Sequence, residues 1–242
     1  MSTYKALDAY FKIKDAQGHY ETVKAIDVYA TKLGGKKVKA SDIQFFSDGR
    51  AVAANKGVLN ALAIYKAAAK SAPKWPKNDT SLFFGSLLRN ADTFGFDSQG
   101  AKNARQNYRN KCVQYGGLLL AFQIELNARK AKIAKHKLLM ANTQAHCASM
   151  AGWFQKFARI PSIMTSAEQG QWFMLSEAAV KMAGNASSCQ AELAKLEKTN
   201  NQTLKDCADT IKTNSLWIKW IETKGPEKPG ALKKNLKTTK PK

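Results

Sequence analysis

Acidic residues are scarce in this sequence. Eighteen Asp and Glu stand against 39 Lys and Arg, which gives a net charge of +21 at pH 7. A surface with such an imbalance repels itself unless anions screen it, so we expect an anionic partner. Nucleic acid, an anionic membrane surface and an acidic protein chain all meet this expectation, and charge alone does not distinguish between them.

Long hydrophobic runs are also missing. The most apolar stretch, residues 116–122, is much shorter than the roughly 20 residues that a membrane-spanning helix needs. Residues 1–30 alternate polar and apolar side chains, without the unbroken hydrophobic segment of a cleaved signal peptide. We therefore expect a chain that does not span a membrane, and that is cytoplasmic or exported without a cleaved signal peptide.

The sequence lacks the motifs of common metal sites and enzymes. It has no phosphate-binding loop, dinucleotide fingerprint, nucleophile elbow or zinc-protease motif. Of the three histidines, His19, His136 and His146, the last two have no acidic residue close by in sequence to act with them as an acid–base pair. We expect no metal, no cofactor and no enzymatic activity.

The four cysteines also lack the close paired spacing of a zinc site. Two of them, Cys189 and Cys207, flank the polar segment 199–201 almost symmetrically. A turn in that segment would bring the two thiols together as a disulfide between antiparallel helices. The alternative is that both remain reduced and act as small apolar core residues.

With 44% hydrophobic residues, the chain has enough apolar side chains to build a core. The first fifty residues differ from the rest. Residues 10–14 alternate, residues 15–18 are turn formers, and residues 19–29 are rich in β-branched and aromatic side chains. Turn residues at 34–35 and 48–49 bracket a further candidate strand over residues 38–46. These features favour a small N-terminal β-hairpin or sheet over residues 1–50.

From residue 51 onward the apolar spacing becomes helical, and we expect a helical domain over residues 51–222. The first helix should stop before Pro73, and Asp79 is placed to cap the next one. Gly116 and Gly117 should end an amphipathic helix over residues 101–115. A capping box formed by Thr165 and Glu168 predicts a further helix start.

Between residues 119 and 157, apolar side chains recur every seven residues. The main seam runs from Leu119 to Phe154, and a second, mixed seam runs from Phe122 to Phe157 and includes Arg129 and His136. This pattern predicts one helix of nearly forty residues that ends before Pro161 and packs in a bundle. The expected fold class is mainly α.

The last twenty residues have a different composition. Residues 224–242 contain seven lysines, three prolines and one glutamate, with no aromatic residue. Such a segment cannot bury enough surface to fold, so we expect a disordered basic tail over residues 223–242. It would serve either as an electrostatic arm for a polyanion or as a solubilising end.

The middle of the chain concentrates the positive charge. Between Asp97 and Glu168 only one acid, Glu125, stands among eleven bases, so the ion pairs that usually stabilise helix faces are missing within this stretch. Bases left unpaired in this way favour contact with a phosphate backbone. The predicted contact residues are Lys102, Arg105, Arg109, Lys111, Arg129, Lys130, Lys132, Lys135 and Lys137.

Two aromatic side chains lie among these bases. Tyr108 and Tyr115 would be able to stack on nucleic-acid bases if their rings faced the solvent. Both also share the apolar face of the helix that they belong to, which favours a place in the core.

The sequence therefore predicts a non-enzymatic, sequence-tolerant nucleic-acid-binding protein of the coating or packaging type, with homo-oligomerisation as a further possibility. The first alternative is an exported toxin or effector that acts at an anionic membrane, because Trp217 and Trp220 flank Lys219 as in interfacial helices. The second is a structural assembly protein whose basic helices meet an acidic partner.

Overall fold

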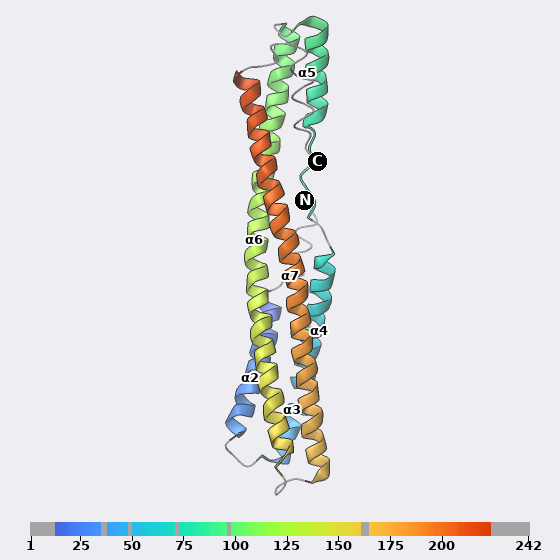
Figure 1. The fold of residues 1–242 in the computed structure, drawn as a ribbon, viewed down its shortest axis with the longest axis vertical. Helices are drawn as coiled ribbons and strands as arrows, with labels where there is room; N and C mark the ends of the chain where they lie inside the picture. The colour runs from blue at the N-terminus through green and yellow to red at the C-terminus, as the bar shows by residue number, and fades with distance from the viewer. Residues whose placement is uncertain are drawn as a thin grey trace. The chain divides into compact units, whose positions relative to one another are not determined.

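The structure, a computed structural model, describes residues 13–34, 38–47, 50–70, 73–95, 98–160 and 165–223 (Figure 1). These residues form helices and their connections, and no strand occurs among them. The prediction of a mainly helical bundle is confirmed. The six helices are α2 (Ile13–Leu33), α3 (Ala40–Ser47), α4 (Arg50–Ala69), α5 (Thr80–Phe94), α6 (Gln99–Ala158) and α7 (Ser166–Thr223).

The chain divides into two compact units. Unit 1 consists of Met1–Pro73 and Lys130–Thr199, and unit 2 consists of Lys74–Arg129 and Asn200–Lys242. Both long helices, α6 and α7, therefore contribute to each unit, while α2, α3 and α4 belong to unit 1 and α5 to unit 2. The domain boundary that we expected near residue 50 falls inside unit 1.

The expected N-terminal β-hairpin is wrong for the residues that the structure describes. Residues 13–33 are helical because Val23, Ile26 and Ala30 share one helical face, and all three are at most 2% exposed. This buried stripe outweighs the local β propensity of residues 19–29. The helix also packs on α4, where Gly57 leaves the room that the His19 ring occupies. Residues 1–12 lie outside the described residues.

The strand expected over residues 38–46 is also a helix, α3. Asp42 explains its start, because its Oδ2 accepts a hydrogen bond of 2.8 Å from the backbone amide of Lys39. The other carboxylate oxygen accepts a hydrogen bond of 2.9 Å from the Tyr29 hydroxyl on α2. One carboxylate thus satisfies a free amide at the helix N-terminus and ties α3 to α2.

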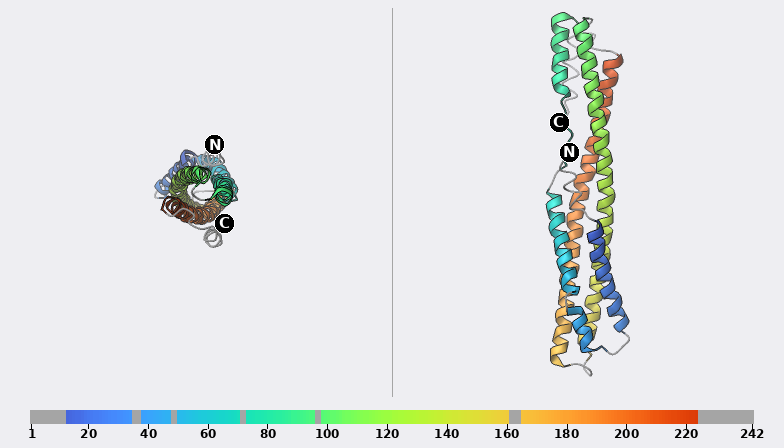
Figure 2. Two further views of the ribbon diagram at one scale, coloured as in Figure 1. Left: turned by 90° about the horizontal axis from the view of Figure 1, so that it is seen from above. Right: turned by 180° about the vertical axis from the view of Figure 1, so that it is seen from behind.

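Large aromatic rings fill the core of unit 1. The indole of Trp172 is fully buried, with its ring centroid 5.1 to 5.8 Å from those of Phe46, Phe154 and Phe157. These four residues come from α3, α6 and α7, which lie side by side in this unit in both the front view (Figure 1) and the view from behind (Figure 2). Aromatic packing of this kind contributes beyond the area that it buries.

The heptad prediction for α6 is confirmed, and the helix is longer than expected. The main seam is at most 2% exposed and the second seam at most 7% exposed throughout. The main seam comprises Leu119, Leu126, Ile133, Met140, Cys147 and Phe154, and the second comprises Phe122, Arg129, His136, Thr143, Met150 and Phe157.

The expected helix end at Gly116 and Gly117 is wrong, since α6 continues through both residues. A glycine inside a helix costs only about 1 kcal/mol relative to alanine, which packing of the seams readily offsets. The absence of a side chain at Gly116 also leaves room for Asn214 of α7. A Cβ at residue 116 would lie 3.0 Å from Nδ2 of Asn214, which is a tight contact.

The expected turn at residues 199–201 is wrong as well, because α7 is one continuous helix of 58 residues. Three of its side chains bond backbone oxygens of α6 in unit 2. Asn200 donates to Leu126 at 3.1 Å, Cys207 to Leu119 at 3.5 Å, and Asn214 to Cys112 at 2.8 Å. Each step moves seven residues forward on α7 and seven back on α6, so the helices are antiparallel and these bonds fix their register.

Predictions for other helix ends have mixed outcomes. The capping box is confirmed, since the Thr165 amide donates to Glu168 Oε2 at 2.8 Å and the Glu168 amide donates to Thr165 Oγ1 at 3.3 Å. As expected, α4 ends before Pro73. At the start of α5, the Thr80 amide donates to Asn78 Oδ1, while the Asp79 carboxylate pairs with Lys77.

None of the described helices combines the length and apolar character that crossing a membrane requires.

The seam of α6 makes a direct prediction for stability. Ile133 is fully buried and Leu138, five residues later on the same helix, is 63% exposed. We expect Ile133→Ala to lower the free energy of unfolding by about 2–5 kcal/mol because it leaves a cavity. Leu138→Ala is the matched control and should change it by less than about 0.5 kcal/mol. Urea unfolding measures the stability of both variants. Equal losses of stability would contradict the burial of the seam at Ile133.

Candidate nucleic-acid interface

Four predicted contact residues lie in the N-terminal part of α6, within unit 2. Lys102 is exposed, whereas Arg105, Arg109 and Lys111 are half-buried. They occupy the first turns of α6, on the N-terminal side of Leu119, where the heptad seam begins. Their heads are therefore accessible to different degrees, and Lys102 is the most open of them.

Arg109 is paired with an acid that the local sequence does not reveal. Its Nε and Nη2 donate to Glu222 Oε1 near the end of α7 at 2.7 and 2.5 Å. The two side chains are 37% and 42% exposed, so the pair contributes little to stability, about 0–1 kcal/mol. Ion pairs within the stretch are few, as expected, but Arg109 is not left unpaired, because α7 supplies a partner from outside the stretch.

Lys111 also has a partner in unit 2. Its ammonium group lies 5.1 Å from the centroid of the Phe83 ring on α5. A cation in this position is attracted by the electron-rich face of the ring, by about 0.5–1 kcal/mol at an exposed site. Lys111 therefore stabilises the packing of α5 on α6 and is less open to a ligand than Lys102.

The predicted contacts in unit 1 are equally mixed. Lys130 and Lys135 are exposed, and Lys132 is half-buried. Lys137 donates to Glu197 Oε2 on α7 at 2.6 Å, again across the antiparallel hairpin. In this unit, Lys130 and Lys135 are the predicted residues with the most accessible charge.

Three predicted contact or stacking residues face the core of unit 2. Arg129 is 7% exposed, Tyr108 is 6% and Tyr115 is 9% exposed. Burial raises the pKa of both tyrosines, and the Tyr108 ring packs against that of Phe84 at 5.2 Å. Neither ring offers a face to a base, which agrees with the alternative that they are core residues.

The structure does not contain the possible Cys189–Cys207 disulfide and agrees with the alternative of reduced core thiols. All four cysteines are free and buried. Cys189 and Cys207 lie on the same helix, so their 18-residue separation places them roughly 27 Å apart along its axis. Burial raises the pKa of the Cys189 thiol to about 12 and that of the Cys147 thiol likewise to about 12. These thiols remain protonated and act as small apolar side chains.

Two histidines in unit 1 have partners from distant parts of the chain. His146 Nδ1 lies 2.8 Å from Asp27 Oδ2 on α2. His136 Nδ1 lies 2.6 Å from the Tyr65 hydroxyl on α4, and burial, followed by the charge of Lys132, lowers the pKa of His136 to about 4. The acid beside His146 escaped the sequence analysis because it is 119 residues away.

The described residues contain no cluster of side chains suited to a metal ion. Cys147 follows His146, but the raised pKa of its thiol opposes a nucleophilic role.

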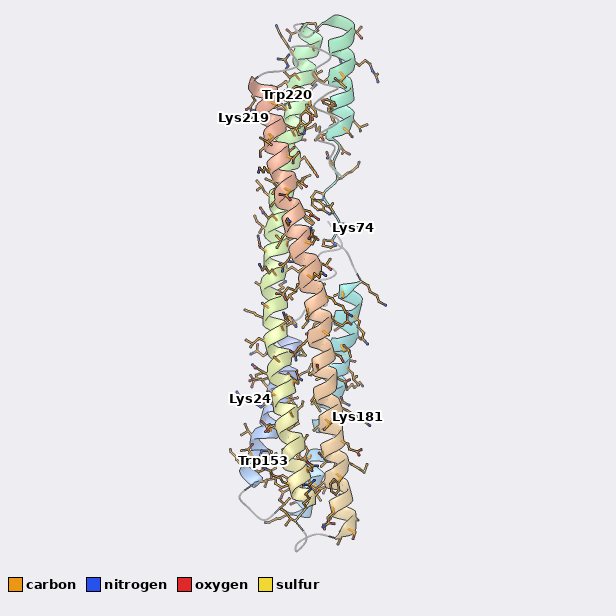
Figure 3. All side chains as sticks on the ribbon, viewed as in Figure 1. Lys24, Lys74, Trp153, Lys181, Lys219 and Trp220 are labelled. Carbon is orange, nitrogen blue, oxygen red and sulfur yellow. The ribbon has the colours of Figure 1, made fainter. Side chains whose placement is uncertain are left out.

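One accessible aromatic residue escaped the sequence analysis. Trp75 lies in the connector between α4 and α5 and is 41% exposed, with exposed lysines on both sides at 74 and 77. Figure 3 shows the Lys74 side chain on this connector. The signal in the sequence is a tryptophan between Pro73 and Pro76, with Lys74 and Lys77 close to it.

The cysteines give a direct chemical prediction. Without any reductant, the native protein should react very slowly with a thiol reagent, because all four thiols are buried. After unfolding in denaturant, four thiols per chain should react. Two reactive thiols in unfolded, unreduced protein would instead indicate a disulfide.

The buried His136 predicts a dependence of stability on pH. Because the pKa of His136 is about 4 in the folded protein against 6.5 for the free side chain, the unfolded chain binds the extra proton first as the pH falls. We expect this group to lower the free energy of unfolding between pH 6.5 and 4, by about 3 kcal/mol at most. Urea unfolding of wild type and His136→Gln over this range measures the difference, and identical pH profiles would contradict it.

A comparison of the chain with protein-family models, curated proteins and solved structures finds no match.

Proposed function

We propose that this protein binds nucleic acid without sequence preference, through the basic end of unit 2 and the lysine-rich segment that follows it. The observation that carries the proposal is the pairing of Arg109 with Glu222. It joins the start of α6, where Lys102, Arg105, Arg109 and Lys111 lie, to the end of α7 at Thr223.

The antiparallel hairpin brings two basic parts of the sequence to one end of unit 2. Lys102 lies two helical turns from Arg109 in the direction of the α6 N-terminus. The segment 224–242, with its seven lysines, begins two residues after Glu222. Lys219 is exposed one turn before Glu222 on α7, as Figure 3 shows. Lys102 on α6 and Lys219 on α7, which are far apart in the sequence, thus both lie near the Arg109–Glu222 pair in unit 2.

On α6 itself, few acids are available to neutralise these basic side chains. Among the described residues of α6 in unit 2, Glu125 is the one acid, and it lies more than three turns from Lys111. Glu222 is occupied by Arg109 in an exposed pair, which a phosphate can replace at little cost. This supports attraction of a polyanion to the end of unit 2.

The type of side chain supports sequence-tolerant binding. Lysines act as point charges toward phosphate oxygens, and phosphate contacts carry no information on base sequence. Each contact releases condensed counterions, so the affinity should fall steeply with salt. Lys130 and Lys135 in unit 1 are exposed and available for further phosphate contacts.

Salt dependence tests the proposal. We expect the logarithm of the affinity for a mixed-sequence oligonucleotide to fall linearly with the logarithm of salt concentration, with a slope of about 0.7–0.9 per phosphate contacted. In a variant with Lys102 and the seven lysines of residues 224–242 changed to Gln, the slope of this plot should be smaller in magnitude by several units. Fluorescence anisotropy at several salt concentrations measures this.

The control uses lysines that are exposed in unit 1. Figure 3 shows Lys24 and Lys181 there, on α2 and α7. Changing both to Gln should leave the slope unchanged, because neither lysine belongs to the proposed interface. Wild-type affinity that stays constant between low and high salt would overturn the proposal. Binding to anionic vesicles without binding to oligonucleotide would overturn it in favour of a membrane surface.

A further inference from the structure

The connector Pro73–Asp79 holds a tryptophan in a defined position on unit 2. The Trp75 ring packs against the Phe122 ring, with centroids 5.3 Å apart and planes 47° apart. Phe122 belongs to the second seam of α6 and is 5% exposed. Pro73 and Pro76 restrict the backbone on both sides of Trp75. The ring therefore rests on a rigid helix and is held by a stiff chain.

Trp75 differs from the other four tryptophans in its exposure. Trp172 is fully buried, and Trp153, Trp217 and Trp220 are half-buried. Trp217 packs edge to face on Trp220, and Trp153 has Lys156 over its ring. Trp75 is 41% exposed, and its ring contacts that of Phe122. Packing on Phe122 thus covers part of the Trp75 side chain, and the rest of the side chain is accessible to solvent.

Two lysines lie close to Trp75 in the sequence, one before it and one after it. Lys74 is exposed, and the Lys77 side chain is 86% exposed. Lys77 pairs with Asp79 at 3.3 Å, and an ion pair as exposed as this one contributes little. Proteins that bind single strands combine accessible aromatic side chains, on which nucleobases stack, with basic side chains that contact the phosphates.

We infer that Trp75, with Lys74 and Lys77, forms a stacking site for an unpaired base of single-stranded nucleic acid. The inference rests on the proposed nucleic-acid binding and specifies the class of strand. In a duplex, the faces of the bases are covered by their neighbours, so a ring that stacks on a base favours single strands over duplexes. The site takes the role that Tyr108 and Tyr115, being buried, cannot fill.

The test compares single-stranded and duplex oligonucleotides of equal length at one salt concentration. Trp75→Leu keeps an apolar contact with Phe122 but removes the aromatic face. We expect it to weaken single-strand binding about tenfold, since stacking on an aromatic ring contributes that much or more per base. Duplex binding should stay within about twofold. Trp75→Phe, which keeps an aromatic face, should restore most of the single-strand affinity.

Phe173 on α7 in unit 1 provides a matched control, because it is an aromatic side chain of similar exposure, 45%. Phe173→Leu should leave both affinities unchanged. Equal weakening of single-strand and duplex binding by Trp75→Leu, or no change in either, would overturn the stacking site while leaving the proposed function intact. Failure of the wild-type protein to bind any oligonucleotide would overturn the proposed function itself. Circular dichroism and thermal unfolding of each variant confirm that it is folded.

Discussion

The heptad seams between the two long helices are the constraint on which both units depend. Every seam position of α6 from Leu119 to Phe157 is buried, although the set includes Arg129 and His136. In unit 2 the facing seam of α7 is largely polar, and Asn200 and Asn214 donate to backbone oxygens of α6. A buried amide without such a partner is costly, so these bonds disfavour a shifted register as well as stabilising the observed one.

The same pairing decides how the charge of α6 is used. Within its own sequence α6 has almost no acids, but α7 brings Glu197 to Lys137 in unit 1 and Glu222 to Arg109 in unit 2. These pairs reduce the local excess of positive charge, while Lys102 and Lys135 remain exposed. The register between α6 and α7 determines which basic side chains are paired with acids, and therefore which of them are available to a polyanion.

Features that depend on neighbouring residues were predictable, and features that depend on distant ones were not. The capping box at Thr165 and the seven-residue spacing of α6 needed only local sequence, and both are confirmed. The hairpin expected before residue 50 failed because a stripe of buried residues, including Val23, overrides local β propensity. The turn expected at residues 199–201 failed because Asn200 finds its partner on α6, a helix the local sequence does not show.

By itself the sequence determined the helical class, the length of the α6 seam and the large positive charge, because composition and periodicity follow directly from the order of residues. Tertiary structure alone decided which side chains remain accessible. It buried Tyr108, separated Cys189 from Cys207 along one helix, and left Trp75 exposed on Phe122. The physical reason is that accessibility depends on which distant helix covers a side chain, and packing between helices sets that.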